Sequence, residues 1–385
     1  MTDDPGDVVV IGSGAIGGAV AVHLLEDPDF DGRVTIIERD PTFKRASSAL
    51  SAAGTRRQFS TPENIKMSAF SFDWMRERFD VGITEGGYLY LSSPATAAAL
   101  EENHAIQRAE GADVVLLTPA ELADRFPWLS TDGVALGSLG RSGEGWFDGY
   151  ALLQGLRGRA RELGAELMTG EVVGMTLAKG RVASVQLAGG ASRPCGTVVD
   201  AAGPWAAEIA LMAGIELPVE ARCRSVFVFD VERDAPTGAP LVIDTSGAWF
   251  RPEGGSFIAG IAPAPEDDLP DLSLTPDHAL FEEQLWPALA NRVPAFDAIR
   301  VMNAWAGYYE MNTFDHNAII GRHPEVTNLL FANGFSGHGI QQAPAVGRAI
   351  AELIVHDRFV TLDLSVFAYE RIEGGRPVVE RNVIG

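Results

Sequence analysis

Lysine is nearly absent from this sequence: Lys44, Lys66 and Lys179 are the only three among 385 residues. Arginine therefore carries almost all of the positive charge, and acidic residues exceed basic ones so far that the formal net charge is −22. A surface of that sign repels phosphate groups. We therefore expect binding neither to nucleic acid nor to an anionic membrane surface.

Cysteine is scarce as well, and long apolar runs are missing. Cys195 and Cys223 are the only cysteines, and their spacing fits neither a disulfide framework nor a metal site. No apolar run approaches the ~20 residues that cross a bilayer. Residues 1–7 lack the basic start of a signal peptide. We expect a cytoplasmic protein with no bound metal and no membrane span.

Glycine, in contrast, is abundant, and three glycines near the start are the most informative. The apolar residues 8–11 run into Gly12, Gly14 and Gly17, which have GxGxxG spacing, and a second apolar run at 34–37 ends in Glu38. This order is typical of a strand–turn–helix–strand unit that binds a dinucleotide. This pattern alone does not distinguish NAD from FAD as the bound dinucleotide.

Each of these residues has a mechanical reason to be there. Gly12 permits the tight turn, Gly14 lets the backbone approach a pyrophosphate, and Gly17 lets the helix pack closely on the strand. The start of the helix offers free N–H groups to the phosphates. Glu38 can accept hydrogen bonds from ribose hydroxyls, and its charge disfavours a 2′-phosphate.

A second strand–glycine–helix junction lies more than three hundred residues later. Apolar residues 328–333 break at Gly334 and at Gly337-His338-Gly339, and a helix is expected from 340 to 355. A helix start can stabilise negative charge on a flavin ring. Because an extended FAD needs one helix for its phosphates and another for its ring, the two junctions together favour FAD.

Four blocks of sequence carry a family resemblance that covers nearly the whole chain. They are Val10 to Gly18 with Glu38, Ser47 to Arg56, Asp200 to Trp205, and Ile319 to Gly321 with Gly334 to Ile340. With these blocks the chain resembles the FAD-dependent amino-acid and amine oxidoreductases, the DAO family of D-amino-acid, glycine and sarcosine oxidases and dehydrogenases. Within the family it is most similar to the branch of D-arginine dehydrogenase and sarcosine dehydrogenase-like proteins.

The expected architecture is α/β (α+β overall), with a Rossmann-type FAD-binding domain interleaved with a β-rich antiparallel-sheet substrate domain. We assign residues 1–85, 141–215 and 306–385 to the FAD-binding domain. Residues 86–140 and 216–305 form the substrate domain. Within the first domain, Asp148 is a plausible N-cap for a helix over 150–163.

The resemblance implies a set of cofactor-binding residues. FAD is expected to bind without a covalent link, because residues 306–309 hold no cysteine, the attachment point in some relatives. The residues expected at the pyrophosphate are Gly12, Gly14, Ala15, Ile16 and Gly17; at the ribose, Glu38; at the adenine, Arg39 and Val172; near phosphate or flavin, Ser47, Ser48, Ala52 and Ala53; along the channel, Ala202, Gly203 and Trp205; and around the isoalloxazine, Gly307, Gly337, His338, Gly339 and Ile340.

The resemblance also implies oxidation of a C–N bond of an amino acid or secondary amine, by hydride transfer to flavin N5, to an imine that water hydrolyses. A substrate carboxylate needs a guanidinium. Arg56, Arg224 and Arg251 are the candidates, with Arg224 expected to begin the strand that runs through 225–231. Tyr309 stands where many relatives carry an arginine, so either one of these three arginines binds the carboxylate or the substrate lacks an α-carboxylate in the usual place. Trp249 and His338 complete the expected catalytic set.

The electron acceptor is the least determined feature. Sarcosine oxidases use a lysine near the flavin to activate oxygen, and the corresponding stretch here, 256–260, has none. We therefore favour a dehydrogenase that passes electrons to a quinone or another acceptor. An oxidase using O2, a flavin monooxygenase and a non-catalytic FAD-containing assembly factor remain alternatives, and the amine and the oligomeric state stay open.

Overall fold

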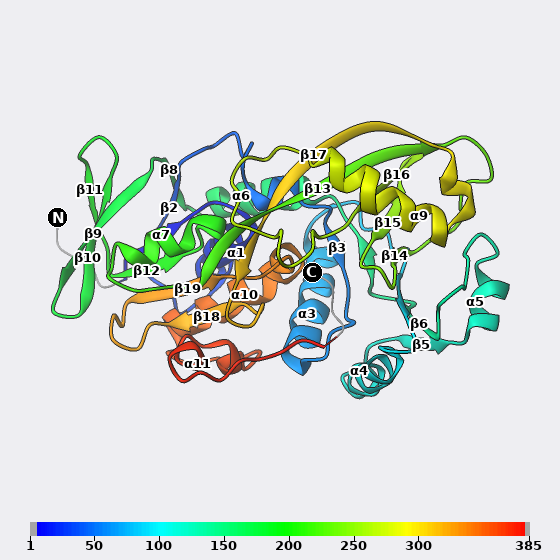
Figure 1. Cartoon of the computed structure of the whole chain (residues 1–385). Coiled ribbons are helices and arrows are strands. Elements are labelled where there is room, and N and C mark those ends of the chain that lie inside the picture. Colours follow the sequence, from blue (N-terminus) through cyan, green and yellow to red (C-terminus); the bar gives the residue numbers. More distant parts are fainter. Residues whose placement is uncertain (1–5, 382–385) are drawn as a thin grey trace.

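The structure, a computed structural model, describes residues 6–381, and two large sheets organise it (Figure 1). Parallel pairing joins every neighbour in the six-stranded sheet except β18, which runs antiparallel to β19. In spatial order its strands are β18 (Ile319–Arg322), β19 (Leu329–Asn333), β12 (Thr197–Asp200), β1 (Val8–Ile11), β2 (Val34–Glu38) and β8 (Glu166–Thr169).

One face of this sheet is covered by helices that come from distant parts of the chain (Figure 1). Apolar side chains of β1, such as Val10, pack there against Val20 and Val346 in one continuous core. A Cβ on Gly347 would lie 2.5 Å from the backbone carbon of Ala19, so only glycine permits this approach of the first and last long helices. The helices are α1 (Ala15–Glu26), α3 (Pro62–Arg78), α6 (Gly149–Glu162) and α10 (Gly339–Val355).

A three-stranded antiparallel sheet and a short helix cover the opposite face. Their apolar residues, among them Val185 and Ile209, form a second core with Val9 and Phe331 of the large sheet. The elements are β9 (Val172–Ala178), β10 (Arg181–Leu187), β11 (Ser192–Pro194) and α7 (Ala206–Leu211). The parallel sheet is thus buried on both faces, as βαβ connections require.

The eight-stranded sheet is built around two long strands that pair antiparallel from Val219↔Asn312 to Val231↔Ile299. A cluster of phenylalanines, including Phe227, Phe229 and Phe296, fills its core. In order the strands are β17 (Ile299–Asn312), β13 (Val219–Val231), β16 (Ser256–Gly260), β15 (Trp249–Glu253), β14 (Leu241–Ile243), β4 (Tyr88–Ser92), β6 (Leu136–Gly140) and β5 (Val114–Leu117).

The remaining elements are short or lie on the outside of the two sheets. They are α2 (Ser47–Leu50), the pair β3 (Gly54–Thr55) and β7 (Gly145–Trp146), α4 (Ala97–Ala109), α5 (Pro119–Arg125), α8 (His278–Leu280), α9 (Trp286–Arg292), α11 (Glu370–Glu373), a π-helical turn at Phe281–Leu285, and 3₁₀ turns at Gly203–Trp205, Pro294–Asp297 and Ser365–Phe367.

The predicted fold class is confirmed, and one local expectation needs correction. The Asp148 side chain accepts a hydrogen bond from the Ala151 N–H at 2.9 Å, so it caps α6 as expected. Arg224, however, does not begin a strand: it lies in the middle of β13, which starts at Val219. The sequence 219–223 is polar enough to resemble a loop, and pairing with β17 extends the strand through it.

The division into two interleaved domains remains our proposal. The six-stranded sheet draws its strands from 8–38, 166–200 and 319–333, and the eight-stranded sheet draws from 88–140 and 219–312. The proposed boundary at 305/306 falls inside β17, which therefore belongs to both parts.

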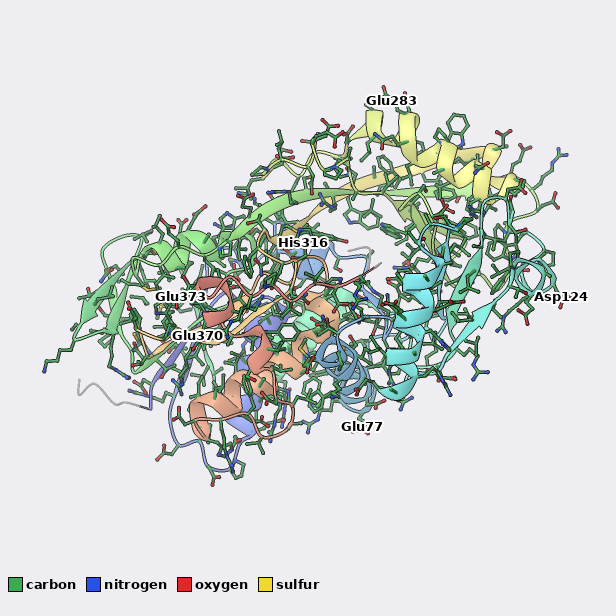
Figure 2. The ribbon with its side chains drawn as sticks, turned by 60° about the horizontal axis from the view of Figure 1, so that its bottom comes forward. Glu77, Asp124, Glu283, His316, Glu370 and Glu373 are labelled. Carbon is green, nitrogen blue, oxygen red and sulfur yellow. The ribbon has the colours of Figure 1, made fainter. Side chains whose placement is uncertain are left out.

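The acidic excess lies on the outside of the molecule. Glu77, Asp124, Glu283, Glu370 and Glu373 are all exposed; the last two lie on α11, and the others lie on α3, α5 and the π-helical turn (Figure 2). Across residues 6–381, no helix is both long enough and apolar enough to cross a bilayer.

The last helix is tied to the end of β17 by a buried ion pair. Asp315 Oδ2 lies 2.8 Å from Arg371 Nε, and the two side chains are 0% and 5% exposed. We expect Asp315→Ala to lower the free energy of unfolding by ~3–5 kcal/mol, because it leaves a buried guanidinium without its partner. Urea unfolding measures this. Glu102→Ala, which removes the exposed partner of Arg381, is the control and is expected to cost less than ~1 kcal/mol. Equal costs for the two variants would contradict the prediction.

Candidate functional site

Two glycines of the turn between β1 and α1 have no space for a side chain. Gly12 has a φ of +100°, and a Cβ on it would lie 2.3 Å from the carbonyl oxygen of Ala201. A Cβ on Gly17 would lie 2.0 Å from the carbonyl oxygen of Gly12. The carboxylate of Glu38 accepts a hydrogen bond from the Ser13 N–H at 2.9 Å, so it also holds the turn in place.

An elongated cavity begins at this turn, and we call it the glycine-turn cavity. Within it the guanidinium carbon of Arg39 lies 3.5 Å from the centre of the Trp205 ring, and that of Arg45 lies 5.4 Å from it. Arginine over an indole face is a favourable cation–π contact. The cavity is also lined by Ile11, Gly12, Gly14, Ala15, Ile37, Glu38, Glu171, Val172, Ala202, Gly203 and Glu208.

A second cavity, which we call the arginine–tyrosine cavity, lies beside the first. It is lined by Arg56, Tyr88, Arg224, Trp249 and Tyr309, among others. Ile16, Ser47, Ser48 and Glu310 line both cavities, so the two adjoin, and together we call them the channel. The hydroxyl of Ser48 accepts a hydrogen bond from the Ala15 N–H at 3.0 Å, which links α2 to the start of α1.

The start of α10 forms one wall of the arginine–tyrosine cavity. Gly337, Gly339, Ile340 and Gln341 all line it. Gly337 has a φ of +94°, and a Cβ on it would lie 2.6 Å from the ring of Tyr309. The partial positive charge of a 17-residue helix is therefore directed at this cavity.

His338 is buried behind this wall. Its side chain packs edge-on against Phe59, with ring centres 5.1 Å apart, and it is not among the residues that line either cavity. Burial, with a further contribution from the nearby Arg56, lowers the pKa of His338 well below its ordinary value. His338 is therefore neutral at pH 7.

Arg224 enters the arginine–tyrosine cavity already paired with a carboxylate. Its two terminal nitrogens lie 2.6 and 2.7 Å from the oxygens of Asp268, a bidentate ion pair. Asp268 belongs to the segment 261–277, which connects β16 to α8 without a strand or long helix. The guanidinium carbon of Arg224 also lies 5.1 Å from the centre of the Tyr309 ring.

Arg56 is the second arginine of this cavity, and it is more deeply buried. It is 6% exposed, and its guanidinium carbon lies 4.9 Å from the Phe59 ring and 5.8 Å from the Tyr88 ring. Its backbone N–H donates to Gln341 Oε1 at 2.8 Å, which joins it to α10. Burial raises the pKa of Tyr88, so its hydroxyl stays protonated beside this cation.

Arg251 does not reach the cavity, contrary to expectation. Its side chain is 5% exposed, forms an ion pair with Glu253, and donates to the carbonyl oxygen of Ala52 at 2.9 Å. It therefore supports the loop behind the cavity wall. Trp249 does line the cavity, whereas Phe250 is fully buried in the sheet core.

The structure thus brings most of the residues chosen from the sequence to one channel. Three do not line it: Gly17, His338 and Arg251. Those that do are Gly12, Gly14, Ala15, Ile16, Glu38, Arg39, Ser47, Ser48, Ala52, Ala53, Arg56, Val172, Ala202, Gly203, Trp205, Arg224, Trp249, Gly307, Tyr309, Gly337, Gly339 and Ile340.

Several further residues belong to the site. Tyr88, Glu310 and Gln341 line the channel, and Asp268 pairs with Arg224, which lines it; the four come from separate segments, and none carries a motif. The Arg224–Asp268 pair spans 44 residues and the Arg56–Gln341 contact spans 285. Their charge and polarity were the only available signals, and many other residues share them.

The three lysines and two cysteines lie outside the channel. Lys44, Lys66 and Lys179 are all exposed, and neither they nor Cys195 and Cys223 line either cavity. The channel therefore offers arginines as its cations.

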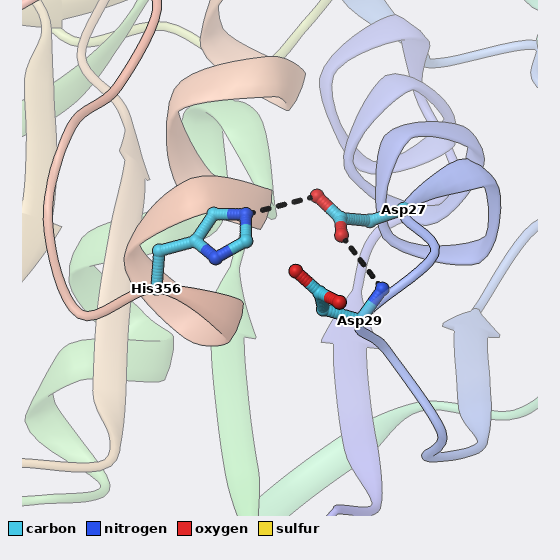
Figure 3. A group of neighbouring side chains, drawn as sticks. All are labelled: Asp27, Asp29 and His356. Atoms are coloured by element: carbon cyan, nitrogen blue, oxygen red, sulfur yellow. Dashed lines mark hydrogen bonds and ion pairs between the residues drawn. The ribbon is translucent and has the colours of Figure 1, made fainter.

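A separate group of side chains joins the ends of two helices. His356, directly after α10, lies 3.3 Å from Asp27 Oδ2 at the end of α1, and Asp27 also accepts from the Asp29 N–H at 3.1 Å (Figure 3). Asp27 is already engaged on both oxygens by protein donors. We interpret the group as a helix-end contact.

The comparisons with known proteins place this channel in a family. Residues 7–353 match the family model described as FAD dependent oxidoreductase. The chain belongs to that family, and FAD is its cofactor.

Individual relatives refine this placement. The chain is 43% identical to FAD-dependent oxidoreductase domain-containing protein 1 of Xenopus laevis, over 98% of this chain and 85% of that protein. It is 26% identical to the glycine oxidase of Geobacillus kaustophilus, over 95% of this chain and 97% of that enzyme. Among solved structures, the L-proline dehydrogenase of P. horikoshii superposes with a TM-score of 0.87 at 28% identity, over 97% and 99% of the two chains.

Gly14 allows a test of the glycine turn that leaves the fold intact. A Cβ there would approach nothing more closely than Ser48 Oγ at 3.4 Å, an ordinary contact. We expect Gly14→Ala to fold normally but to bind FAD at least about tenfold more weakly, or ~1.4 kcal/mol, because the methyl group occupies cavity space. Flavin released by acid precipitation of the purified proteins measures retention, and fluorescence titration measures affinity.

Gly158→Ala is the matched control for this variant. Gly158 lies in α6 with open space around it, so the change is expected to leave FAD binding unaltered. If Gly14→Ala binds FAD with the affinity of the wild type, the pyrophosphate of FAD does not lie at this glycine turn.

Proposed function

We propose that FAD binds along the whole channel, with its adenosine end in the glycine-turn cavity and its flavin ring in the arginine–tyrosine cavity. The first cavity supplies the close backbone approach and the free amides of α1. The second supplies the start of α10. Ser47 Oγ, which is buried beside both cavities and has no hydrogen-bond partner among residues 6–381, is a donor suited to such a ligand.

We propose that the protein oxidises the C–N bond of an amino acid or secondary amine. The observation that carries this proposal is a cavity with two arginines and an aromatic wall, placed beside the start of α10 and adjoining the glycine-turn cavity. The substrate loses a hydride from the carbon next to nitrogen and a proton from the nitrogen. When bound, FAD supplies the acceptor for that hydride. Water then hydrolyses the imine.

The protein's own part is to bind, orient and shield the substrate. Arg224 and Arg56 are the groups suited to a substrate carboxylate, because a guanidinium can hold both oxygens. Tyr309 and Trp249 form apolar walls that exclude water from the reacting carbon. The protonated Tyr88 adds no competing negative charge.

We infer a dehydrogenase rather than an oxidase. The residues that line the cavities include no lysine to activate oxygen, and all three lysines of the chain are exposed. A quinone or another carrier is then the electron acceptor. The cofactor is held without a covalent link, since neither cysteine lines the channel.

Anaerobic reduction tests the proposed reaction. We expect D-amino acids, N-methyl amino acids or prolines to include a compound that bleaches the flavin band near about 450 nm, while its analogue without the carboxylate does so far more slowly. Air admitted afterwards is expected to restore the band more slowly than a quinone does. NADPH alone is expected to have no effect.

The contrary results each point to one alternative. Bleaching by NADPH without amine would indicate a monooxygenase, and reoxidation by air at the turnover rate would indicate an oxidase. Bound FAD that no amine or amino acid reduces would indicate a non-catalytic FAD protein.

The Arg224–Asp268 pair makes a second prediction about substrate binding. A substrate carboxylate must displace Asp268 from Arg224, so we expect Asp268→Asn to bind a simple carboxylate such as benzoate about tenfold more tightly, or ~1.4 kcal/mol. Perturbation of the flavin spectrum measures the Kd. Asp267→Asn, at the exposed neighbouring position, is the control and is expected to match the wild type. Unchanged affinity in Asp268→Asn would exclude Arg224 as the carboxylate site.

A further inference from the structure

Glu310 occupies the junction of the channel and has no role in the reaction above. It is among the four residues that line both cavities. Its Oε2 accepts a hydrogen bond from the Gly334 N–H at 3.2 Å. Gly203, which lines the glycine-turn cavity, lies close to the same oxygen: a Cβ on it would be 4.0 Å away, an ordinary contact. The carboxyl group therefore lies where the two cavities adjoin.

Another acid lies near Glu310. Asp200, at the end of β12, is 0% exposed, and its Oδ2 has no hydrogen-bond partner among the residues that the structure describes. Repulsion from Glu310 contributes to the rise of the Asp200 pKa well above its ordinary value, although burial is the larger cause. Two acids that share a desolvated site resist ionisation together.

The cations around Glu310 are engaged elsewhere. On β13, Glu310 pairs with Ala221, so the flanking Glu220 and Arg222 project from the other face, where they lie 2.6 Å apart. Within residues 6–381, no ion pair with Glu310 is present. The other charged groups that line the channel are Glu38, Arg39, Asp40, Arg45, Glu171 and Glu208 in the glycine-turn cavity and Arg56 and Arg224 in the arginine–tyrosine cavity.

Burial without a cation raises the pKa of Glu310 to about 8. At pH 7 the side chain is therefore mostly a neutral carboxylic acid, which can donate as well as accept a hydrogen bond. In an ionised form it would place a negative charge in the middle of a channel that receives a pyrophosphate.

We propose that Glu310 binds FAD in its protonated form and donates a hydrogen bond to an oxygen of the chain that joins the flavin ring to the adenosine, so that FAD affinity depends on a proton held by this residue. The inference rests on the proposed position of FAD in the channel. It makes Glu310 a positioning residue for the cofactor rather than a catalytic one.

The sign of the pH dependence follows from linkage. A bound pyrophosphate disfavours the ionised carboxylate further, so the pKa of Glu310 is higher with FAD than without it. Affinity is therefore fully present below the pKa of the FAD-free protein, about 8, and is lost as the pH rises above it. Between the two pKa values the loss approaches tenfold per pH unit, and FAD binding takes up a proton.

The test is the Kd for FAD from pH 6 to pH 10, taken from flavin fluorescence after serial dilution of the purified holoprotein. The wild type is expected to show a constant Kd at low pH and a rise that approaches tenfold per unit above about pH 8. Glu310→Gln keeps a donor that does not titrate, so its Kd is expected to stay near the low-pH value throughout. Glu208→Gln removes an exposed acid from the same channel and is expected to keep the wild-type slope.

Calorimetry of FAD binding in two buffers of different ionisation enthalpy provides a second readout that needs no variant. The wild type is expected to take up close to one proton near pH 9. A pH-independent wild-type Kd, no proton uptake, or the same slope in Glu310→Gln would each overturn the proposal while leaving FAD in the channel. Normal FAD binding by Gly14→Ala would instead overturn the position of the cofactor.

Discussion

The backbone contact between the first glycine turn and the first helix is the constraint on which the rest of the structure depends. A side chain on Gly17 would overlap the carbonyl oxygen of Gly12, and one on Gly12 would overlap that of Ala201. The three segments therefore meet with no side chain between them. This contact fixes where α1 starts relative to β1 and β12. That position determines where the glycine-turn cavity lies, how Glu38 is placed and how α10 packs on α1.

The sequence alone was sufficient to predict those parts of the site in which the residues that contact one another lie close together in the chain. The two glycine junctions and Glu38 could be found because each depends on residues close in the chain. Asp268 and Glu310 could not, since their importance arises from partners that only the folded chain provides. Arg251 was misplaced for a related reason. It shares a strand face with Trp249, which lines the cavity, but Glu253 and the carbonyl oxygen of the distant Ala52 hold its guanidinium behind the wall.

On the substrate side, the presence of an arginine in the sequence did not by itself show whether its side chain lines the cavity. Arg56, Arg224 and Arg251 are all largely buried, yet their partners separate them. Arg251 is held by Glu253 and a backbone carbonyl behind the wall, and Arg224 is held by Asp268, the acid that a substrate carboxylate replaces in our proposal. The two arginines differ in where their counterions lie: Glu253 is on β15, whereas Asp268 is on a connecting segment.

Strand β17 lies beside both cavities, and its Glu310 lines the two of them. Tyr309 lies on the side of Arg224, whereas the ring of Tyr308 meets that of Trp205, which lines the glycine-turn cavity, with centres 5.5 Å apart. Successive side chains of one strand thus contact residues from different parts of the channel. Under the proposed function, a substitution of Tyr309, which lines the arginine–tyrosine cavity alone, changes the substrate side and leaves the lining of the glycine-turn cavity unaltered. The two ends of the channel are then free to vary independently.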